Sequence, residues 1–166
     1  MQFFMIKPDG MSLETKILKM IEPLVDVVES RLFNPVDIEK IERLYSVHKD
    51  KFFYPYLIDY FRGKPIKTYV LFEKKGARYE KSFFDDFLEL VGDTDPERAK
   101  PGTIRSLSED SLKRSIPEKR AVRNLVHRST TLEEAKKEAA IFFEDDARVC
   151  ERTTDEHVKA PDKKPV

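Results

Sequence analysis

The chain has 166 residues, of which 40% are hydrophobic and 37% charged, and 31 basic residues balance 31 acidic ones. This composition is typical of one globular domain and excludes a disordered or fibrous chain. A net charge of zero argues against binding of nucleic acid by bulk electrostatics. A single cysteine excludes an internal disulfide, and the chain lacks the run of roughly 20 apolar residues that a membrane helix needs. We therefore expect a cytoplasmic protein without a membrane partner.

Apolar residues at strand and helix spacing predict the elements of the N-terminal half. The run from Phe3 to Ile6 stops at Pro8-Asp9-Gly10, which is typical of a buried strand that ends in a turn. Asp37 is placed to cap a helix, and Gly63 suits a helix end. The elements expected in chain order are a strand over 3–6, a helix over 13–24, a strand over 25–33, helices over 37–45 and 53–63, and a strand over 66–72.

The C-terminal half contains a long stretch without an apolar period. A helix is predicted over 76–91, whereas residues 92–120 show no such stripe, and a loop of that length in a compact domain is usually functional. Residues 121–126 are a strand candidate. Thr131 and Glu134 form the pattern of a capping box at the start of a final helix.

The order of these elements predicts an α+β fold. A ferredoxin-like four-stranded antiparallel sheet with helices packed on one face, in the order β-α-β-β-α-β with extra helices, fits it best. Residues 1–145 are expected to form this domain. Residues 146–166 have no aromatics and many charges, so they are expected to be a polar tail.

Among the histidines, His127 has the surroundings that favour chemistry. It follows a predicted strand and precedes a predicted helix, with Asn124 and Ser129 close by, and Glu138 lies further along that helix. A histidine nucleophile must be neutral, because the imidazolium has no lone pair, and a carboxylate at its second nitrogen fixes the tautomer. The pattern alone leaves a purely structural role open. The remaining histidines, interpreted as structural or solvated, are His48 and His157.

Several turns carry groups that suit phosphate oxygens. Pro101-Gly-Thr-Ile-Arg105 joins a turn that exposes backbone N–H groups to a hydroxyl and a guanidinium, whose planar fork matches an anionic oxygen cluster. Gly92-Asp-Thr94 supplies another hydroxyl, and Lys7 brings an ammonium to the end of the first strand. Each is an ordinary turn when taken alone. Together they indicate an anion site.

These groups fall within a series of motifs. The motifs are Ile6-Lys-Pro-Asp-Gly10, Tyr45 with Phe53, Gly92-x-Thr94-x-Pro96, Pro101-Gly-Thr-Ile-Arg105 and Arg123-Asn-x-x-His127-x-Ser129. They occur in the order found in nucleoside diphosphate kinases, a family that the chain resembles over about residues 2–143. The resemblance implies a ping-pong transfer of the terminal phosphoryl group from a nucleoside triphosphate to a nucleoside diphosphate through a phosphohistidine.

The resemblance implies catalytic roles by position. His127 matches the phosphorylated histidine, and Glu138 and Ser129 match the pair that holds it. Tyr45 matches the tyrosine beside that histidine. Lys7 matches a residue that reaches the ribose hydroxyl and the phosphates and favours the transition state.

The resemblance also implies how the nucleotide is bound. Asn124 matches a second residue at the ribose hydroxyl and the phosphates, and Thr94 and Arg105 match phosphate ligands. Phe53 matches the aromatic on which the base stacks, and because every base has a π face, broad nucleotide choice follows. Mg2+ is expected to be carried by the nucleotide phosphates rather than by a protein cage. Nucleoside di- and triphosphates are the expected partners, and the chain is expected to form a homo-oligomer.

The chain departs from the family pattern in several places. The family has an arginine six residues before the Gly-x-Thr threonine, where this chain has Leu88, and the candidate replacements are Arg78 and Lys81. The loss of one charged hydrogen bond costs about 1.5–3 kcal/mol. The alternative is therefore a low-activity nucleotide-binding or regulatory homologue. The loop over 106–122 is longer than usual, and the first turn is shorter at residues 11–13.

A third reading is a nucleic-acid-binding module, since basic residues crowd around the long loop. We prefer the interpretation that such a rim only attracts nucleotide phosphates, so no nucleic-acid partner is expected. The basic residues concerned are Lys113, Arg114, Lys119, Arg120, Arg123 and Arg128.

Overall fold

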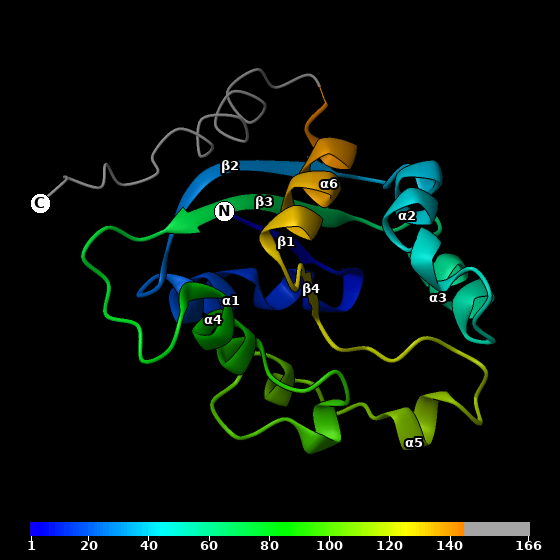
Figure 1. The fold of residues 1–166 in the computed structure, drawn as a ribbon. Helices are drawn as coiled ribbons and strands as arrows, with labels where there is room; N and C mark the ends of the chain where they lie inside the picture. The colour runs from blue at the N-terminus through cyan, green and yellow to red at the C-terminus, as the bar shows by residue number, and fades with distance from the viewer. Residues whose placement is uncertain (145–166) are drawn as a thin grey trace, which may run out of the picture.

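The structure is a computed structural model that describes residues 1–144 (Figure 1). The polar tail expected over 146–166 lies outside the described residues, so the domain boundary remains a prediction. Within residues 1–144, no helix is long and apolar enough to cross a lipid bilayer.

Four strands form one antiparallel sheet in the order β2-β3-β1-β4. The continuous apolar run of the first strand is fully buried, and this strand accordingly takes an inner position in the sheet. The strands are β1 (Gln2–Ile6), β2 (Val25–Phe33), β3 (Ile66–Glu73) and β4 (Val126–Arg128). The predicted α+β, ferredoxin-like sheet is confirmed.

The helices connect the strands in the predicted order (Figure 1). The α-helices are α1 (Glu14–Ile21), α2 (Ile38–Leu44), α3 (Tyr54–Phe61), α4 (Phe83–Val91), α5 (Leu112–Ser115) and α6 (Leu132–Phe142). The 3-10 turns are η1 (Pro8–Leu13), η2 (Ser46–His48), η3 (Pro96–Arg98) and η4 (Arg105–Leu107).

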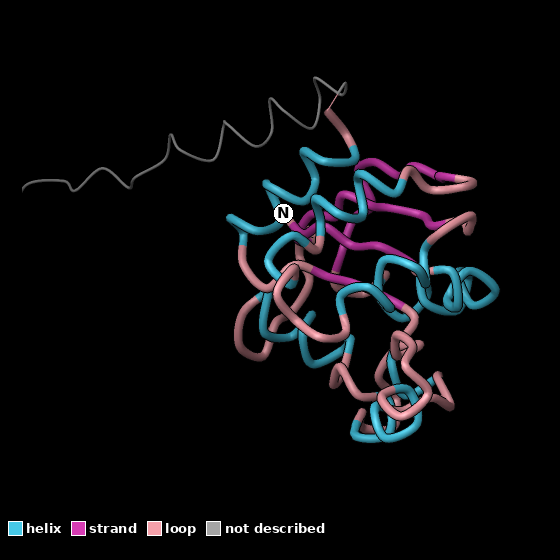
Figure 2. The backbone as a smooth tube through the Cα atoms, turned by 90° about the vertical axis from the view of Figure 1, so that its right-hand side faces the viewer, coloured by secondary structure: helices cyan, strands magenta, loops and turns pink. Residues whose placement is uncertain are grey.

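Helices cover both faces of the sheet, whereas they were expected on one (Figure 2). Phe3 and Met5 of β1 join a cluster with α2, α3 and α6, and Phe4 and Ile6 join a second cluster with α1 and α4. The crossover helices α1 and α4 do share one face, as expected. The second layer is needed because successive strand residues point to opposite faces, and β1 is apolar at every position but its first.

The start of α4 differs from the prediction. Residues 76–82 form a loop, and the helix begins only at Phe83, where the Ser82 hydroxyl accepts a hydrogen bond from the Asp85 backbone N–H across 3.1 Å. The Asp86 carboxylate accepts the backbone N–H groups of Glu80 and Lys81 across 2.6 and 3.2 Å. A cap residue inside the predicted span therefore makes the helix begin later than predicted.

The last strand also begins later than predicted. Residues 121–125 are irregular, and β4 starts at Val126. Leu125 has a φ of 70°, in the left-handed region that a strand cannot contain. Its backbone is held there by the N-terminal turn, because Asp9 accepts the Leu125 N–H across 3.0 Å and Lys7 N–H donates to the Leu125 carbonyl across 2.9 Å.

Side-chain caps set the ends of the helices that carry the site. The Asp37 carboxylate accepts the Glu39 N–H across 3.0 Å, as predicted for α2. Thr131 caps α6 by accepting the Glu134 N–H across 3.1 Å. The expected capping box is only half formed, because the Glu134 carboxylate accepts the N–H of Thr130 rather than that of Thr131.

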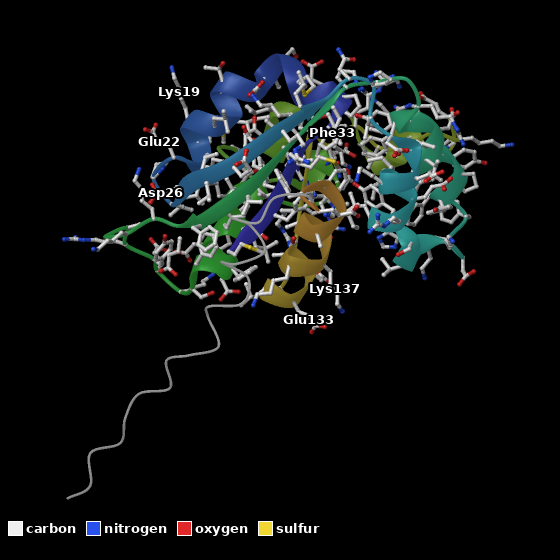
Figure 3. The ribbon with its side chains drawn as sticks, turned by 90° about the horizontal axis from the view of Figure 1, so that it is seen from above. Lys19, Glu22, Asp26, Phe33, Glu133 and Lys137 are labelled. Atoms are coloured by element: carbon white, nitrogen blue, oxygen red, sulfur yellow. The ribbon has the colours of Figure 1, made fainter. Side chains whose placement is uncertain are left out.

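The final helix turns an apolar face to the sheet and a charged face outward. Ala135, Ala139 and Phe142 are buried. Glu133 and Lys137 form an ion pair of 2.8 Å on the opposite face and project away from the sheet (Figure 3). This pattern holds α6 against the N-terminal part of β1, beside β4.

Candidate active site

A cavity of about 590 Å³ lies between α3, the loop over 92–125 and the strand β4. Among the described residues, its wall contains no aspartate or glutamate. The cationic residues in the wall are Lys7, Arg105, Arg120 and Arg128. The cavity is therefore built for an anion. Its wall also contains His127 and every residue predicted to bind the nucleotide.

The imidazole of His127 is held by a carboxylate on α6. Its Nε2 lies 3.0 Å from Oε1 of Glu138, and the Ser129 hydroxyl donates to Oε2 of the same carboxylate across 2.5 Å. A carboxylate only accepts hydrogen bonds, so Nε2 carries the ring proton and Nδ1 keeps its lone pair. The structure thus brings together the three residues that sequence placed at the nucleophile.

Strand pairing and capping explain this contact. His127 pairs with Met5 in the antiparallel ladder, and Ser129 N–H donates to the Phe3 carbonyl across 3.2 Å, so β4 lies fixed beside β1. The chain then turns into α6 at the Thr131 cap. Glu138 stands about two helical turns further on, opposite the imidazole.

Lys7 follows the last residue of β1 and lines the cavity. The Lys7 ammonium donates to the Asn124 side-chain carbonyl across 2.8 Å, and the Asn124 amide donates to the Thr94 backbone carbonyl across 2.9 Å. Lys7 is only 6% exposed. Burial lowers the pKa of Lys7 to about 8, helped by the nearby Arg105 charge and opposed by Asp9.

A close backbone approach makes this arrangement possible. Gly10 packs directly on the irregular segment before β4, and a Cβ at this position would lie 2.4 Å from the Leu125 carbonyl oxygen. The hydroxyl of Tyr60 donates to one oxygen of Asp9, whose other oxygen accepts the Leu125 N–H across 3.0 Å. The Pro8-Asp9-Gly10 turn therefore positions both Lys7 and the segment that leads to His127.

Arg105 is buried and held mostly by backbone oxygens. One terminal nitrogen donates to the Gly92 carbonyl across 3.2 Å and to the Thr94 hydroxyl across 3.3 Å, and the other donates to the Val126 carbonyl across 3.3 Å. Burial lowers the pKa of Arg105 to about 10, and repulsion from Arg128 adds to the effect. The residue remains charged near neutral pH.

Tyr45 lies edge-on to the imidazole, with the ring centroids of Tyr45 and His127 separated by 5.4 Å at 80°. Its hydroxyl is buried and has no hydrogen-bond partner among the described residues. Burial, assisted by the charge of Glu138, raises the pKa of the Tyr45 hydroxyl far above its ordinary value. The group therefore remains a donor, on a residue that lines the cationic cavity.

The far end of the cavity is apolar and aromatic. Phe53 lies there with His48, their ring centroids 5.6 Å apart. His48, interpreted from the sequence as structural or solvated, is part of the wall. Leu112 and Ile116 come from the long loop, which is not structureless, since it contains η3, η4 and α5. These residues give this part of the cavity an apolar and aromatic lining.

The position of the missing arginine is outside the cavity wall. Leu88 is 42% exposed on α4 and does not line the cavity. Neither proposed replacement lines it, since Arg78 lies in the loop before α4 and Lys81 pairs with Glu89. Sequence reasoning counted Arg128 and Arg120 only among a basic rim, although both line the cavity. The adjacency of Arg128 to His127 in the sequence was a signal that could have identified it.

The fold and the cationic cavity are those of a phosphotransferase. A family model described as nucleoside diphosphate kinase matches residues 1–148. Curated nucleoside diphosphate kinases from Nitratiruptor sp. and Thermus thermophilus are 32% and 34% identical to the chain, covering 83% and 85% of it and 90% and 93% of their own lengths. The chain belongs to the nucleoside diphosphate kinase family. It is thus a kinase that moves a terminal phosphoryl group from a nucleoside triphosphate to a nucleoside diphosphate, and a low-activity regulatory role is not favoured.

Solved structures agree on the fold. A transition-state mimic of the Borrelia burgdorferi nucleoside-diphosphate kinase with bound vanadate and ADP has a TM-score of 0.70 at 24% identity, covering 87% of this chain and 86% of that one. The kinase from Pyrobaculum aerophilum has a TM-score of 0.71 at 23% identity, covering 87% and 95%. Both share the α+β architecture described above.

Proposed function

We propose that Nδ1 of His127 is the nucleophile of a two-step transfer. In the first step Nδ1 forms a bond to the terminal phosphorus of a nucleoside triphosphate, the bridging P–O bond breaks, and the diphosphate leaves. In the second step an oxygen of an acceptor diphosphate takes the phosphoryl group and the P–N bond breaks. The 3.0 Å contact between Nε2 and Glu138 carries this proposal, because it leaves Nδ1 with the lone pair.

Glu138 and Ser129 act by orientation and charge. As Nδ1 bonds to phosphorus, the ring becomes cationic, and the Glu138 carboxylate stabilises that charge through the Nε2 proton. The Ser129 hydroxyl fixes the second carboxylate oxygen across 2.5 Å. The ring therefore enters the reaction already oriented.

The phosphates are bound by Lys7, Arg105, Thr94 and Asn124, with the Tyr45 hydroxyl beside the nucleophile. Preorganised cations and donors stabilise the charge spread over the transferred group, which is the main task of the protein in phosphoryl transfer. We propose that Mg2+ enters with the nucleotide, on its phosphates. The wall fits this role, because it offers cations and hydroxyls to phosphate and, among the described residues, no carboxylate to a metal.

The base is proposed to stack on Phe53. Stacking is worth about 1–3 kcal/mol per base and tolerates every base. The apolar residues Leu112 and Ile116 line the same cavity as Phe53. Broad nucleotide choice follows from this arrangement.

A homo-oligomer in the cytoplasm is proposed as the working form. The edge strand β2 pairs with β3 on one side only, and its Val27 and Leu32 are 51% and 57% exposed. An open strand with apolar side chains favours pairing with another copy of the chain. Nucleic acid is not proposed as a partner, because Arg120 is already paired with Asp110 and Glu118.

Labelling tests the proposed nucleophile. The protein is incubated with ATP labelled at the γ-phosphate, and the adduct is expected to be labile in acid and stable in base. His127→Ala is expected to abolish the label while the protein stays folded by circular dichroism. If the wild type never becomes labelled, or His127→Ala is labelled as well as the wild type, the proposal is wrong.

A further inference from the structure

Arg128 is a cation between His127 and Ser129 in the chain. The family motif leaves its position open, and the sequence pattern placed it only in a basic rim. We infer that Arg128 binds the terminal phosphate of the nucleotide and supplies the cation that Leu88 does not. The inference rests on the proposed function of the cavity. It is carried by the position of Arg128 in the wall, by its unused donors and by the absence of an acidic partner within residues 1–144.

The strand β4 fixes the place of Arg128. Arg128 directly follows His127 in the chain and pairs with Phe4 in the sheet, where β4 is an edge strand. Its half-buried side chain lines the same cavity as His127. The cavity holds the imidazole and the guanidinium in one wall. A phosphate within reach of Nδ1 of His127 is therefore within the same enclosure as Arg128.

The guanidinium of Arg128 is poorly satisfied in the empty site. One terminal nitrogen donates to the Ser129 carbonyl across 3.1 Å. Its Nε is buried and has no partner within residues 1–144. The side chain forms no ion pair with any described carboxylate, although Glu134 and Glu138 are close enough to act on its charge. A buried donor without an acceptor lowers the stability of the empty protein, and an anionic ligand that accepts its hydrogen bond removes this cost.

Arg105 and Arg128 both line the cavity and repel one another. After burial, the charge of Arg128 is the main cause that lowers the pKa of Arg105, and burial lowers the pKa of Arg128 itself. The Nε of Arg105 is also buried without a partner in the described chain. Two like charges facing a cavity without a carboxylate are stabilised together when one multivalent anion lies between them. A terminal phosphate has the charge and the oxygen atoms for this.

The remaining cations are less suited to this role. Arg120 lines the cavity, but its guanidinium is paired with Asp110 across 2.6 Å and Glu118 across 2.5 Å. Lys81 is paired with Glu89 outside the wall. Arg128 is therefore the cation in the wall, apart from the predicted Lys7 and Arg105, that is available to phosphate within the described residues.

Binding of ADP and AMP to the unphosphorylated protein tests the inference, by titration calorimetry in the presence of Mg2+. Arg128→Gln is expected to weaken ADP binding about 10- to 100-fold, the range for one charged hydrogen bond. AMP binding is expected to change less than about threefold, since AMP lacks the outer phosphate. Arg128→Lys, which keeps the charge and loses the fork, is expected to fall between the wild type and Arg128→Gln.

Arg114→Gln is the matched control. Arg114 is an exposed arginine on α5 that does not line the cavity, although its neighbours in that helix do. The substitution therefore removes one positive charge from the same region without changing the cavity wall. Its affinity for ADP is expected to equal that of the wild type. Circular dichroism and thermal unfolding test whether each variant is folded. If Arg128→Gln is unfolded, the affinities of Arg128→Lys for ADP and AMP are compared with those of the wild type instead.

The outcomes separate clearly. Selective loss of ADP affinity supports the inference. Equal loss for ADP and AMP, unchanged affinity for both, or a loss matched by Arg114→Gln overturns it. A failure of the proposed function would be detected in a different experiment, the labelling of the wild type by ATP. ADP binding requires no phosphoryl transfer to His127, so the two failures can be distinguished.

Discussion

The Lys7 ammonium donates to the Asn124 side-chain carbonyl across 2.8 Å, although the two residues are 117 positions apart in the chain. The contact joins the end of β1 to the segment before β4. Lys7 also lines a cavity whose described wall contains no carboxylate. Because the contact is buried and its partner is neutral, the charge of Lys7 is costly until an anion arrives.

Nucleotide binding is expected to weaken as pH rises through about 8. Lys7 has a pKa of about 8 in the empty protein. A phosphate favours the charged ammonium, so binding above this pH must include uptake of a proton, and the Kd is expected to rise by up to about tenfold per pH unit. Calorimetry between pH 7 and 9.5 measures the slope. Lys7→Arg, charged over this whole range, is expected to flatten it, and an equal slope in both proteins would contradict the assignment.

The same shift gives the empty protein the opposite pH dependence. The pKa of Lys7 falls from 10.5 to about 8 on folding, so between these values the unfolded chain binds more protons than the folded one. The free energy of unfolding from this residue therefore increases with pH across that window. Urea unfolding of the wild type and of Lys7→Met at pH 8 and 9.5 measures this change. The free energy of unfolding is expected to increase more with pH in the wild type than in Lys7→Met.

Glu138→Gln is expected to lower kcat about 100-fold with little change in KM. The amide keeps the size of the side chain but cannot stabilise the positive charge that develops on the imidazole. Nucleotide contacts are expected to be unaffected, because Glu138 does not line the cavity. Steady-state kinetics at saturating and limiting nucleotide separate the two parameters.

Glu133→Gln controls for that change. Glu133 lies on the outward face of the same helix, paired with the exposed Lys137. It is expected to have the kcat of the wild type. A similar loss in both variants would mean that the charge of α6, and not the carboxylate at the imidazole, determines the rate.

Tyr45→Phe is expected to weaken nucleotide binding without lowering stability. The Tyr45 hydroxyl has no partner among the described residues, so its removal relieves a desolvation cost of about 1–3 kcal/mol in the empty protein. The proposed hydrogen bond to the charged phosphate is then lost, which costs about 1.5–3 kcal/mol of binding. Tyr60→Phe is the contrast, because the Tyr60 hydroxyl donates to Asp9, and this variant is expected to be destabilised. Urea unfolding of both variants decides the point.

Gly10→Ala is expected to lower both stability and activity. A Cβ would lie 2.4 Å from the Leu125 carbonyl oxygen, and the backbone on either side must move to make room. Such overpacking costs about 1–3 kcal/mol. The movement also displaces Lys7 from Asn124. Chemical unfolding and kcat/KM measure the two effects, and a fully stable variant would show that the turn is more adaptable than the structure implies.

Most of the sheet could be predicted because burial leaves a local pattern. The continuous apolar run of β1 and the spacing in α1, α2 and α3 follow from which side chains meet the core. The span of α4 was predicted too long, since the Ser82 cap lies within a segment of helical period. The span of β4 was wrong because Leu125 takes a left-handed φ imposed by contacts with residues 7–10. Such contacts are distant in sequence and leave no periodic signal.

The site residues could be placed by motif, but their environment could not. The pairing of His127 with Glu138 depends on how α6 packs beside β4. The role of the long loop as a wall depends on the fold of α5, a helix too short to show a period. Arg128 was counted with a rim of basic residues, because sequence does not show which arginines are neutralised by partners. Arg120 is neutralised by Asp110 and Glu118, whereas Arg128 has no ion pair among the residues that the structure describes.

The unbalanced positive charge of the cavity also bears on how long the protein survives. The cations of the empty site repel one another, so a ligand that binds only the folded chain stabilises the protein. The free energy of unfolding rises by about 2.7 kcal/mol at a ligand concentration of 100 times Kd. Resistance to heat and proteolysis should accordingly follow the supply of nucleotides in the cell. Depletion of nucleotides would then remove the enzyme together with its substrates.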